Sequence, residues 1–289
     1  MDLKQLKEVW RERGFRANRK LGQNFLVDKN VKNNILDALP LKPASTVVEI
    51  GSGFGMMSFD LASRCGRLFA VEKDPGICEI MAPLFREREN ITLIRDDILR
   101  LDLCGLAGRE ERIIVFGNIP YYVSTPIIAR IIEQRKCIDG AYIVLQEEVA
   151  DRIVSPPGSK EYGSISCFVQ FYTRPKKLLK IRKNSFYPKP RVESCLLALE
   201  ILRSPSVQVK DRELMFKIIR KAFSERRKKV INPLSGGGFM SLGKDRWKEI
   251  LETCGIDASS RAENLSLSDY ARLADAVGES PKEGDERRG

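Results

Sequence analysis

Residues 49–55 read Glu49-Ile50-Gly51-Ser52-Gly53-Phe54-Gly55. A β-branched run at residues 46–50 leads into these glycines, and a helical pattern follows from Met56 to Arg64. β-Branched runs are typical of strands, and glycine lets a backbone approach a ligand closely at the carboxyl end of a strand. This stretch therefore predicts a strand, a ligand-binding loop and a helix, as in doubly wound α/β proteins.

The same alternation continues along the chain. Four more apolar runs predict strands, at residues 68–71, 91–94, 113–116 and 141–145. Helical segments separate most of these runs, and strands that alternate with helices predict a parallel, doubly wound, Rossmann-like sheet. After residue 200 only helical periodicity remains. We therefore expect an α/β domain with a basic N-terminal segment over residues 1–200, a small helical domain over 201–278 and a disordered charged tail over 279–289.

The composition excludes several kinds of chemistry. The chain has no histidine, which excludes histidine bases, Ser-His-Asp triads and most transition-metal sites. None of the seven cysteines forms a C-x-x-C pair, so we expect reduced, mostly buried thiols and assign no metal site. No run of about 18 apolar residues is present, and the charged N-terminus lacks an apolar signal core. We therefore expect a cytoplasmic protein that does not span a membrane.

The charge points to a polyanionic partner. The formal net charge is +11, and a basic run ends a predicted helix at Arg226, Arg227, Lys228 and Lys229. In a strongly basic protein such a run predicts contacts with nucleic-acid phosphates. The alternative is a solvated helix end, where cations are also favoured.

Carboxylates lie at the ends of the second and third predicted strands and just before the glycine loop. Glu72 comes about 20 residues after Gly51, where a carboxylate can bind both hydroxyls of a ribose. The dinucleotide fingerprint needs a third small residue where this chain has Met56. Glu49 suits a cationic ligand better than a pyrophosphate, and Asp97 can accept from an adenine amine. These features favour S-adenosylmethionine over a dinucleotide, with Gly51 and Gly53 as backbone contacts; the alternative is a tight turn with surface carboxylates.

The fourth predicted strand ends in a loop that suits chemistry on adenine. An adenine amine is a weak nucleophile because its lone pair is delocalised into the ring. The side-chain oxygen of Asn118 and the carbonyl of Ile119 can each accept one N–H, which directs the lone pair at a methyl donor beside Asn118. Tyr121, after Pro120, can stack on an extruded base. The alternative is a plain strand-to-helix turn with Pro126 in the first helical turn.

With these residues the chain resembles the ribosomal RNA adenine dimethylase family, and most closely the small-subunit dimethylases known from kasugamycin resistance. The resemblance runs from about Asn18 to Ala276. Besides the glycine loop, Glu72 and Asp97, it rests on the motifs Leu21-Gly22-Gln23-Asn24-Phe25-Leu26, Asn118 to Pro126, Gln146-Glu147-Glu148-Val149-Ala150, Lys160-Glu161-Tyr162-Gly163, Phe186-Tyr187-Pro188-Lys189-Pro190-Arg191-Val192-Glu193-Ser194, Arg226 to Lys229 and Arg261-Ala262-Glu263-Asn264-Leu265-Ser266. One departure is Tyr122, where many relatives carry asparagine.

The resemblance implies roles for individual residues. Asn24 and Leu26 would close over S-adenosylmethionine, Glu72 would hold its ribose, and Asp97 its adenine. Residues 118–121 would hold the target base, with Phe186 on the other face of that base. The alternative for Phe186 is a loop aromatic packed under two prolines. The implied substrate is a pair of adjacent adenines near the 3′ end of small-subunit rRNA, each methylated twice.

Three other functions stay open at this point. A large-subunit adenine methylase of the macrolide-resistance type shares the fold and the catalytic loop, although the C-terminal motifs favour the small-subunit type. A ribosome-assembly factor could use the fold without catalysis. Such a factor could have lost Glu72, Asp97 and the catalytic loop, so their presence favours an active enzyme. An NAD-dependent oxidoreductase is disfavoured by Met56. We expect a monomer whose partners are rRNA and the small ribosomal subunit.

Overall fold

The computed structural model describes residues 3–12, 14–15, 22–108 and 112–279. The chain divides into two compact units, Met1–Ala150 with Arg174–Ile201, and Asp151–Thr173 with Leu202–Gly289. The boundary expected at residue 200 falls at the end of the first unit, whereas residues 151–173 group with the C-terminal helices. The predicted tail lies, apart from Glu279, outside the described residues.

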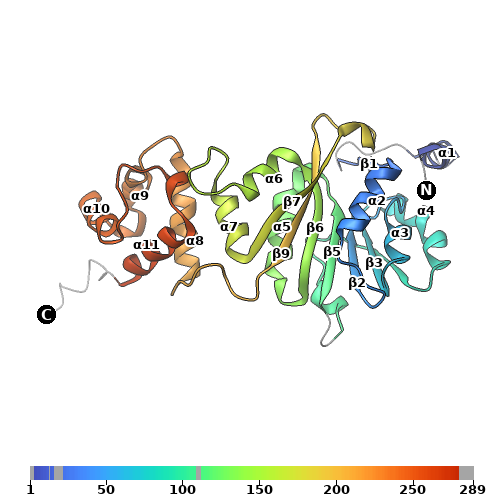
Figure 1. Cartoon of the computed structure of the whole chain (residues 1–289), viewed down its shortest axis with the longest axis horizontal. Helices are drawn as coiled ribbons and strands as arrows, with labels where there is room; N and C mark the ends of the chain where they lie inside the picture. Colours follow the sequence, from blue (N-terminus) through green and yellow to red (C-terminus); the bar gives the residue numbers. More distant parts are fainter. Residues whose placement is uncertain (1–2, 13, 16–21, 109–111, 280–289) are drawn as a thin grey trace. The chain divides into compact units, whose positions relative to one another are not determined.

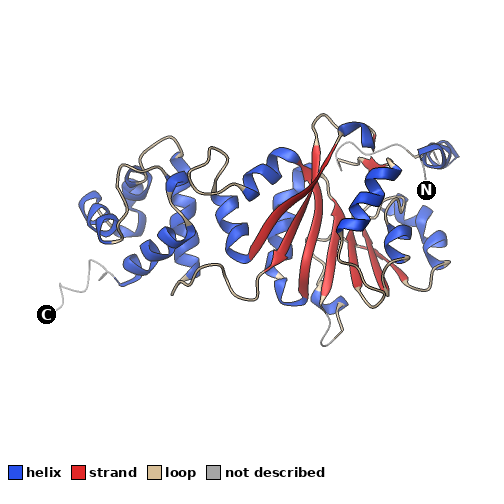
Figure 2. Cartoon of the chain, viewed as in Figure 1, coloured by secondary structure: helices blue, strands red, loops and turns tan. Residues whose placement is uncertain are grey.

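Within the described residues, seven strands form one sheet in the order β4-β3-β2-β5-β6-β9-β7 (Figures 1 and 2). Their bounds are β2 Thr46–Ile50, β3 Arg67–Glu72, β4 Ile91–Arg95, β5 Ile113–Asn118, β6 Ile138–Gln146, β7 Thr173–Ile181 and β9 Ser194–Ile201. The five strands from β4 to β6 are parallel, and β9 pairs antiparallel with β6. All five predicted strands and the doubly wound class are confirmed. Strands β7 and β9 were not predicted; Pro175 is tolerated in β7 because β7 is an edge strand.

The register of the parallel strands brings their functional ends together. Ile50 lies opposite Val71 on one side and opposite Gly117 on the other. The next residues along the three strands are Gly51, Glu72 and Asn118. All three therefore lie at the same edge of the sheet, where the strands end. Carboxyl ends of parallel strands are the usual ligand-binding edge of such sheets.

Three helices connect parallel strands: α3 Ser58–Ala62, α4 Pro75–Arg86 and α5 Ser124–Glu133. Helix α2 (Lys29–Ala38) precedes β2, and α6 (Glu147–Val154) follows β6. Asp28 caps α2, because its side chain accepts from the amides of Asn30 and Val31. Helix α3 is shorter than the predicted Met56–Arg64, because the turns of the glycine loop extend to Met57.

N-terminal residues of the first unit take part in a small second sheet and in an aromatic cluster. Strand β1 (Phe25–Leu26) pairs antiparallel with β8 (Phe186–Tyr187), and helix α1 spans Leu3–Glu12. The ring of Trp10 in α1 has its centroid 5.8 Å from that of Phe25 and 6.2 Å from that of Phe54 in the glycine loop. Aromatic pairs at this spacing add about 0.5–1.5 kcal/mol beyond area burial, so they stabilise the loop.

The second unit has its own apolar core. Its helices are α7 Ser164–Tyr172, α8 Arg212–Ala222, α9 Ile231–Ser235, α10 Lys244–Thr253 and α11 Leu267–Glu279. Trp247 and Tyr270 are fully buried in this core. A capping box begins α11, because Ser266 N donates to the Asp269 carboxylate and Asp269 N donates to Ser266 Oγ. Helix α8 ends at Ala222, so the basic run at residues 226–229, which was predicted to end this helix, follows it instead.

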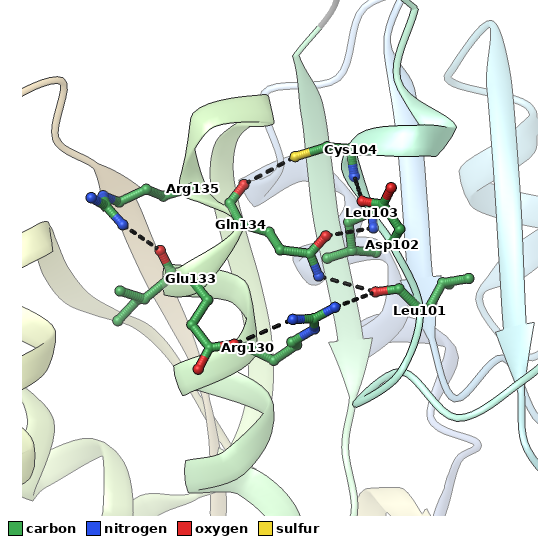
Figure 3. Close-up of polar contacts among 9 residues, drawn as sticks. Leu101, Asp102, Leu103, Cys104, Arg130, Glu133, Gln134 and Arg135 are labelled. Atoms are coloured by element: carbon green, nitrogen blue, oxygen red, sulfur yellow. Dashed lines mark hydrogen bonds and ion pairs between the residues drawn. The ribbon is translucent and has the colours of Figure 1, made fainter.

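One expectation about the cysteines is wrong. Cys104 and Cys137 form a disulfide, although they lie 33 residues apart in the sequence. Gln134 brings their segments together, because its Nε2 donates to the Leu101 carbonyl at 3.0 Å and its Oε1 accepts from Leu103 N at 2.7 Å (Figure 3). This pairing depends on tertiary structure, so no local spacing indicated it. The other five cysteines lie within the described residues as reduced thiols, and all but Cys254 are buried, as expected.

Two structural absences concern the described part of the chain alone. No helix there has the length and apolar character needed to cross a membrane. Nor do three or more His, Cys, Asp or Glu side chains gather there in a way that could hold a metal ion.

Candidate active site

A pocket opens at the carboxyl ends of β2, β3 and β5. Its lining includes Asn24, Phe25, Gly51, Gly53, Glu72, Lys73, Asp97, Leu99, Asn118, Pro120 and Tyr122. Five strands or loops that are distant in the sequence thus contribute to one cavity in the first unit. The residues predicted for the cofactor site largely meet there: Asn24, Gly51, Gly53, Glu72, Asp97 and Asn118.

The glycine loop needs its glycines. Gly51 and Gly53 have φ angles of +72° and +54°, which side chains rarely tolerate. A Cβ atom on Gly53 would also lie 2.8 Å from Cε1 of Phe25. Gly51 N donates to the Val71 carbonyl, so the loop leaves β2 while still bonded to β3. Backbone is therefore exposed to the pocket without an intervening side chain.

Backbone amides fix the carboxylate of Glu72. Gly53 N donates to Oε2 at 2.9 Å, and the amides of Lys73 and Asp74 donate to Oε1 at 2.8 Å. Burial raises the pKa of Glu72, and these three amides partly offset that rise. Oε1 accepts from two amides and Oε2 from one, so an acceptor position on Oε2 stays open to a ligand hydroxyl.

Asp97 shares the pocket with a lysine that sequence reasoning missed. Lys73 Nζ donates to Asp97 Oδ2 at 2.7 Å, and Leu99 N donates to Oδ1. Burial raises the pKa of Asp97, but the Lys73 and Leu99 hydrogen bonds and the Lys73 charge outweigh burial and lower it below the usual value. Asp97 is therefore a charged acceptor at neutral pH. The only sequence signal for Lys73 was its place next to Glu72.

Glu49 does not line the pocket. It is buried under the glycine loop, where Ser58 Oγ donates to its Oε2 at 2.5 Å. Burial raises the pKa of Glu49 to about 8, with smaller contributions from Glu72 and Asp60. The predicted contact of Glu49 with the cofactor stays a prediction. The observed contact is with α3, at the far side of the loop.

The loop after β5 is held at three points. Asn118 Nδ2 donates to the Asn24 carbonyl at 2.9 Å, and Ile119 N donates to the Val144 carbonyl. Tyr121 Oη lies 2.7 Å from Ser194 Oγ. Because the nitrogen of the Asn118 amide is engaged, its oxygen is the group that can accept from a ligand. Asn118 and Pro120 line the pocket, whereas Ile119 is buried and Tyr121 is half-buried beside it.

Leu26 and Phe186 lie apart from the pocket lining. They pair with each other in the register of β1 and β8, and only 3% of Phe186 is exposed. The burial of Phe186 favours the alternative of a packed aromatic over a ring that stacks on the target base. Contacts of Leu26 and Phe186 with ligands stay predictions.

The four residues of the basic run at 226–229, in the second unit, differ in their surroundings. Arg226 forms an ion pair with Glu263, Nε to Oε2 at 3.0 Å, and donates to the carbonyls of Lys160 and Tyr162. Arg227, Lys228 and Lys229 are exposed. The exposed three remain candidates for phosphate contact, whereas the observed contacts of Arg226 are intramolecular.

The parallel sheet, the glycine loop after β2 and the carboxylates after β3 and β4 define a class of protein, the S-adenosylmethionine-dependent methyltransferases with a Rossmann-like fold. Two solved structures share this fold. A dimethyladenosine transferase from Plasmodium falciparum has a TM-score of 0.74 at 20% identity, covering 86% of this chain and 95% of that one. The 23S rRNA methyltransferase ErmE has a TM-score of 0.67 at 19% identity, covering 88% and 100%.

The sequence identifies the family. The family model "Ribosomal RNA adenine dimethylase" matches residues 14–278, and the chain belongs to that family. It is 37% identical over 276 residues to a protein of Alkaliphilus oremlandii called ribosomal RNA small subunit methyltransferase A, covering 94% of this chain and 95% of that one. A protein of the same name from Pelotomaculum thermopropionicum is 36% identical over 280 residues, covering 94% and 95%. The resemblance predicted from the motifs is confirmed.

Proposed function

We propose that the protein transfers methyl groups from S-adenosylmethionine to the N6 amines of two adjacent adenines in small-subunit rRNA, giving N6,N6-dimethyladenosine during ribosome biogenesis. One observation carries this proposal above the others. Asn118, whose amide nitrogen is engaged by the Asn24 carbonyl, lies in the same pocket as Glu72 and Asp97. An acceptor that can orient an amine thus adjoins a site suited to a nucleoside cofactor.

The residues of the pocket fit S-adenosylmethionine. Glu72 would accept from a ribose hydroxyl through Oε2, and Asp97 would accept from the adenine amine. Gly51 and Gly53 present bare backbone, because a side chain on Gly53 would collide with Phe25. When bound, the cofactor supplies a methyl group on a positively charged sulfonium, which leaves as a neutral thioether. An acidic pocket suits that charge.

The chain's own part in the reaction is positioning. The Asn118 oxygen and the Ile119 carbonyl each accept one N–H of the adenine amine, which concentrates the lone pair on nitrogen. Two acceptor dipoles also stabilise the positive charge that develops there. Tyr121 stacks on the base and holds it in line with the methyl group. The proton lost from nitrogen leaves to water, so no side chain has to act as a base.

We further propose that the protein acts in the cytoplasm as a monomer on the small ribosomal subunit. The exposed cations Arg227, Lys228 and Lys229 support contact with RNA phosphates. Under this proposal the first unit carries out catalysis, and the helices of the second unit dock on RNA. Such docking should weaken steeply as salt rises.

Methyl transfer from labelled S-adenosylmethionine to isolated ribosomal subunits tests the proposal. Unmethylated small subunits should yield dimethyladenosine at two adjacent positions, and large subunits should yield none. Label in large subunits would instead support the macrolide-resistance type of methylase. Tight binding to small subunits with no methyl transfer would contradict the proposed catalysis and support a role in ribosome assembly.

A further inference from the structure

The hydroxyl of Tyr121 is hydrogen-bonded to a buried serine hydroxyl. Ser194 is the first residue of β9 and is fully buried, and its Oγ lies 2.7 Å from Tyr121 Oη. In the β6–β9 ladder Ser194 lies opposite Gln146, so its backbone is fixed by the sheet. The hydroxyl of Tyr121 therefore meets a partner that is itself held in a rigid element.

Glu193, the residue before Ser194, is hydrogen-bonded to two other segments of the first unit. Glu193 accepts through its backbone carbonyl from Glu147 N and through Oε2 from Lys183 N at 2.8 Å. The turn at Lys183–Ser185 leads into β8, and the Ser185 carbonyl accepts from Val27 N just after β1. The start of β9 is thus held by β6 and by the β8 turn at once. A hydrogen bond from this point can fix a ring more firmly than one from a loop.

We propose that Ser194 is a positioning residue for methyl transfer, which acts through its hydrogen bond to Tyr121 and so fixes the place of the ring on which the target adenine stacks. The inference rests on the proposed function, because it needs a base against Tyr121. It concerns the acceptor base alone, since Ser194 does not line the cofactor pocket.

Tyrosine needs such an anchor if its ring is to define a base position. A tyrosine side chain has several staggered rotamers about its Cα–Cβ bond, so the backbone alone does not fix where the ring lies. A hydrogen bond at Oη holds the far end of the ring and so selects one of these rotamers. Misplacement of reacting atoms by about 1 Å can cost about a hundredfold in rate. Loss of the anchor should therefore lower turnover more than binding.

The experiment uses the full chain with unmethylated small subunits. Ser194→Ala and Tyr121→Phe each remove the hydrogen bond from one side, and the double variant removes both hydroxyls. We expect each single variant to lower kcat about tenfold, and the double variant to lose little more, because the two groups act through one interaction. KM for subunits should change less than kcat, and the Kd for S-adenosylhomocysteine should be unchanged. Ser194→Thr, which keeps a hydroxyl, should recover most of the kcat.

Ser166→Ala is the matched control. Ser166 is also fully buried, but its Oγ donates to the Arg152 carbonyl in the second unit. This variant should lower the melting temperature without the loss of kcat. If Ser194→Ala fails to fold, Tyr121→Phe alone tests the same bond.

Each outcome decides the inference. Full kcat in Ser194→Ala or in Tyr121→Phe would overturn it, as would additive losses in the double variant or a weaker Kd for S-adenosylhomocysteine. These results would leave the proposed function intact as long as the wild-type protein forms dimethyladenosine. Absence of dimethyladenosine with the wild-type protein would instead overturn the proposed function.

Discussion

Asn118, at the end of β5, donates through Nδ2 to the backbone carbonyl of Asn24 at 2.9 Å, across 94 residues of sequence. This contact joins the loop proposed to hold the target base to the segment just before β1. It also fixes which end of the Asn118 amide can accept from a ligand. The orientation of one side chain thus links the cofactor pocket to the acceptor site.

Asn118→Ala should lower kcat by about 10²–10³, as for loss of a preorganised dipole in other active sites. Binding of S-adenosylhomocysteine should change less, because Glu72, Asp97 and the glycine backbone remain. Methyl transfer to unmethylated small subunits measures the first quantity, and calorimetric titration the second. Asn90→Ala is a matched control, because Asn90 also donates through Nδ2 to backbone carbonyls, those of Ala62 and Cys65, away from the pocket lining. A near-normal kcat in Asn118→Ala would remove this side chain from the mechanism.

Glu49 predicts a dependence of stability on pH. Its pKa is raised from 4.5 to about 8 by burial, so the folded state binds a proton that the unfolded state has lost between these values. Stability should therefore fall as pH rises from about 4.5 to about 8, by at most about 1.4 kcal/mol per pH unit, and level off above. Urea unfolding at several pH values measures this slope.

Glu49→Gln should flatten that slope. The amide is neutral at every pH and keeps an oxygen for the hydroxyl of Ser58. The variant should therefore be more stable than the wild-type protein at pH 8.5 and similar at pH 5. Parallel stability curves for the two proteins would show that Glu49 is charged in the folded state.

Much of the site could be predicted because it follows from local pattern. The strand, the glycine loop and Glu72 occur at fixed spacings, and the parallel topology then requires their ends to meet at one edge of the sheet. Contacts set by tertiary structure could not be predicted in this way. The ion pair of Lys73 with Asp97 joins two loops through the pairing of β3 and β4. The bond of Tyr121 to Ser194 depends on β9, which the sequence reasoning did not assign.

Two expectations show the same limit more directly. The seven cysteines lack paired spacing, and only the packing of the segments near Gln134 brings Cys104 to Cys137. Glu49 was assigned to the cofactor from its charge and its place before the glycines. Its side chain contacts Ser58 of α3, a contact that the local pattern did not indicate, and its contact with the cofactor stays a prediction.

Tyr122 should add to the binding of the cofactor. It is 60% exposed, lines the pocket, and lies where a Cβ on Gly22 would be 3.5 Å from its ring. An exposed ring at the rim can cover a bound nucleoside by stacking. Tyr122→Asn should weaken the Kd of S-adenosylhomocysteine several-fold, whereas Tyr122→Phe should bind as the wild-type protein does. If Tyr122→Asn instead raises only the KM for subunits, the ring contacts RNA rather than the cofactor.

Arg226 and Arg227 are neighbours that should respond to substitution in opposite ways. Arg226→Ala removes the ion pair with Glu263 and the bond to the Tyr162 carbonyl, so it should cost about 1–2 kcal/mol of stability. Arg227 is exposed, so Arg227→Ala should leave the melting temperature unchanged. It should instead weaken subunit binding and reduce the slope of log Kd against log salt by about 1, as for one lost phosphate contact. Thermal melts and filter binding at several salt concentrations separate the two effects. Equal salt slopes for Arg227→Ala and the wild-type protein would show that this exposed cation does not contact RNA.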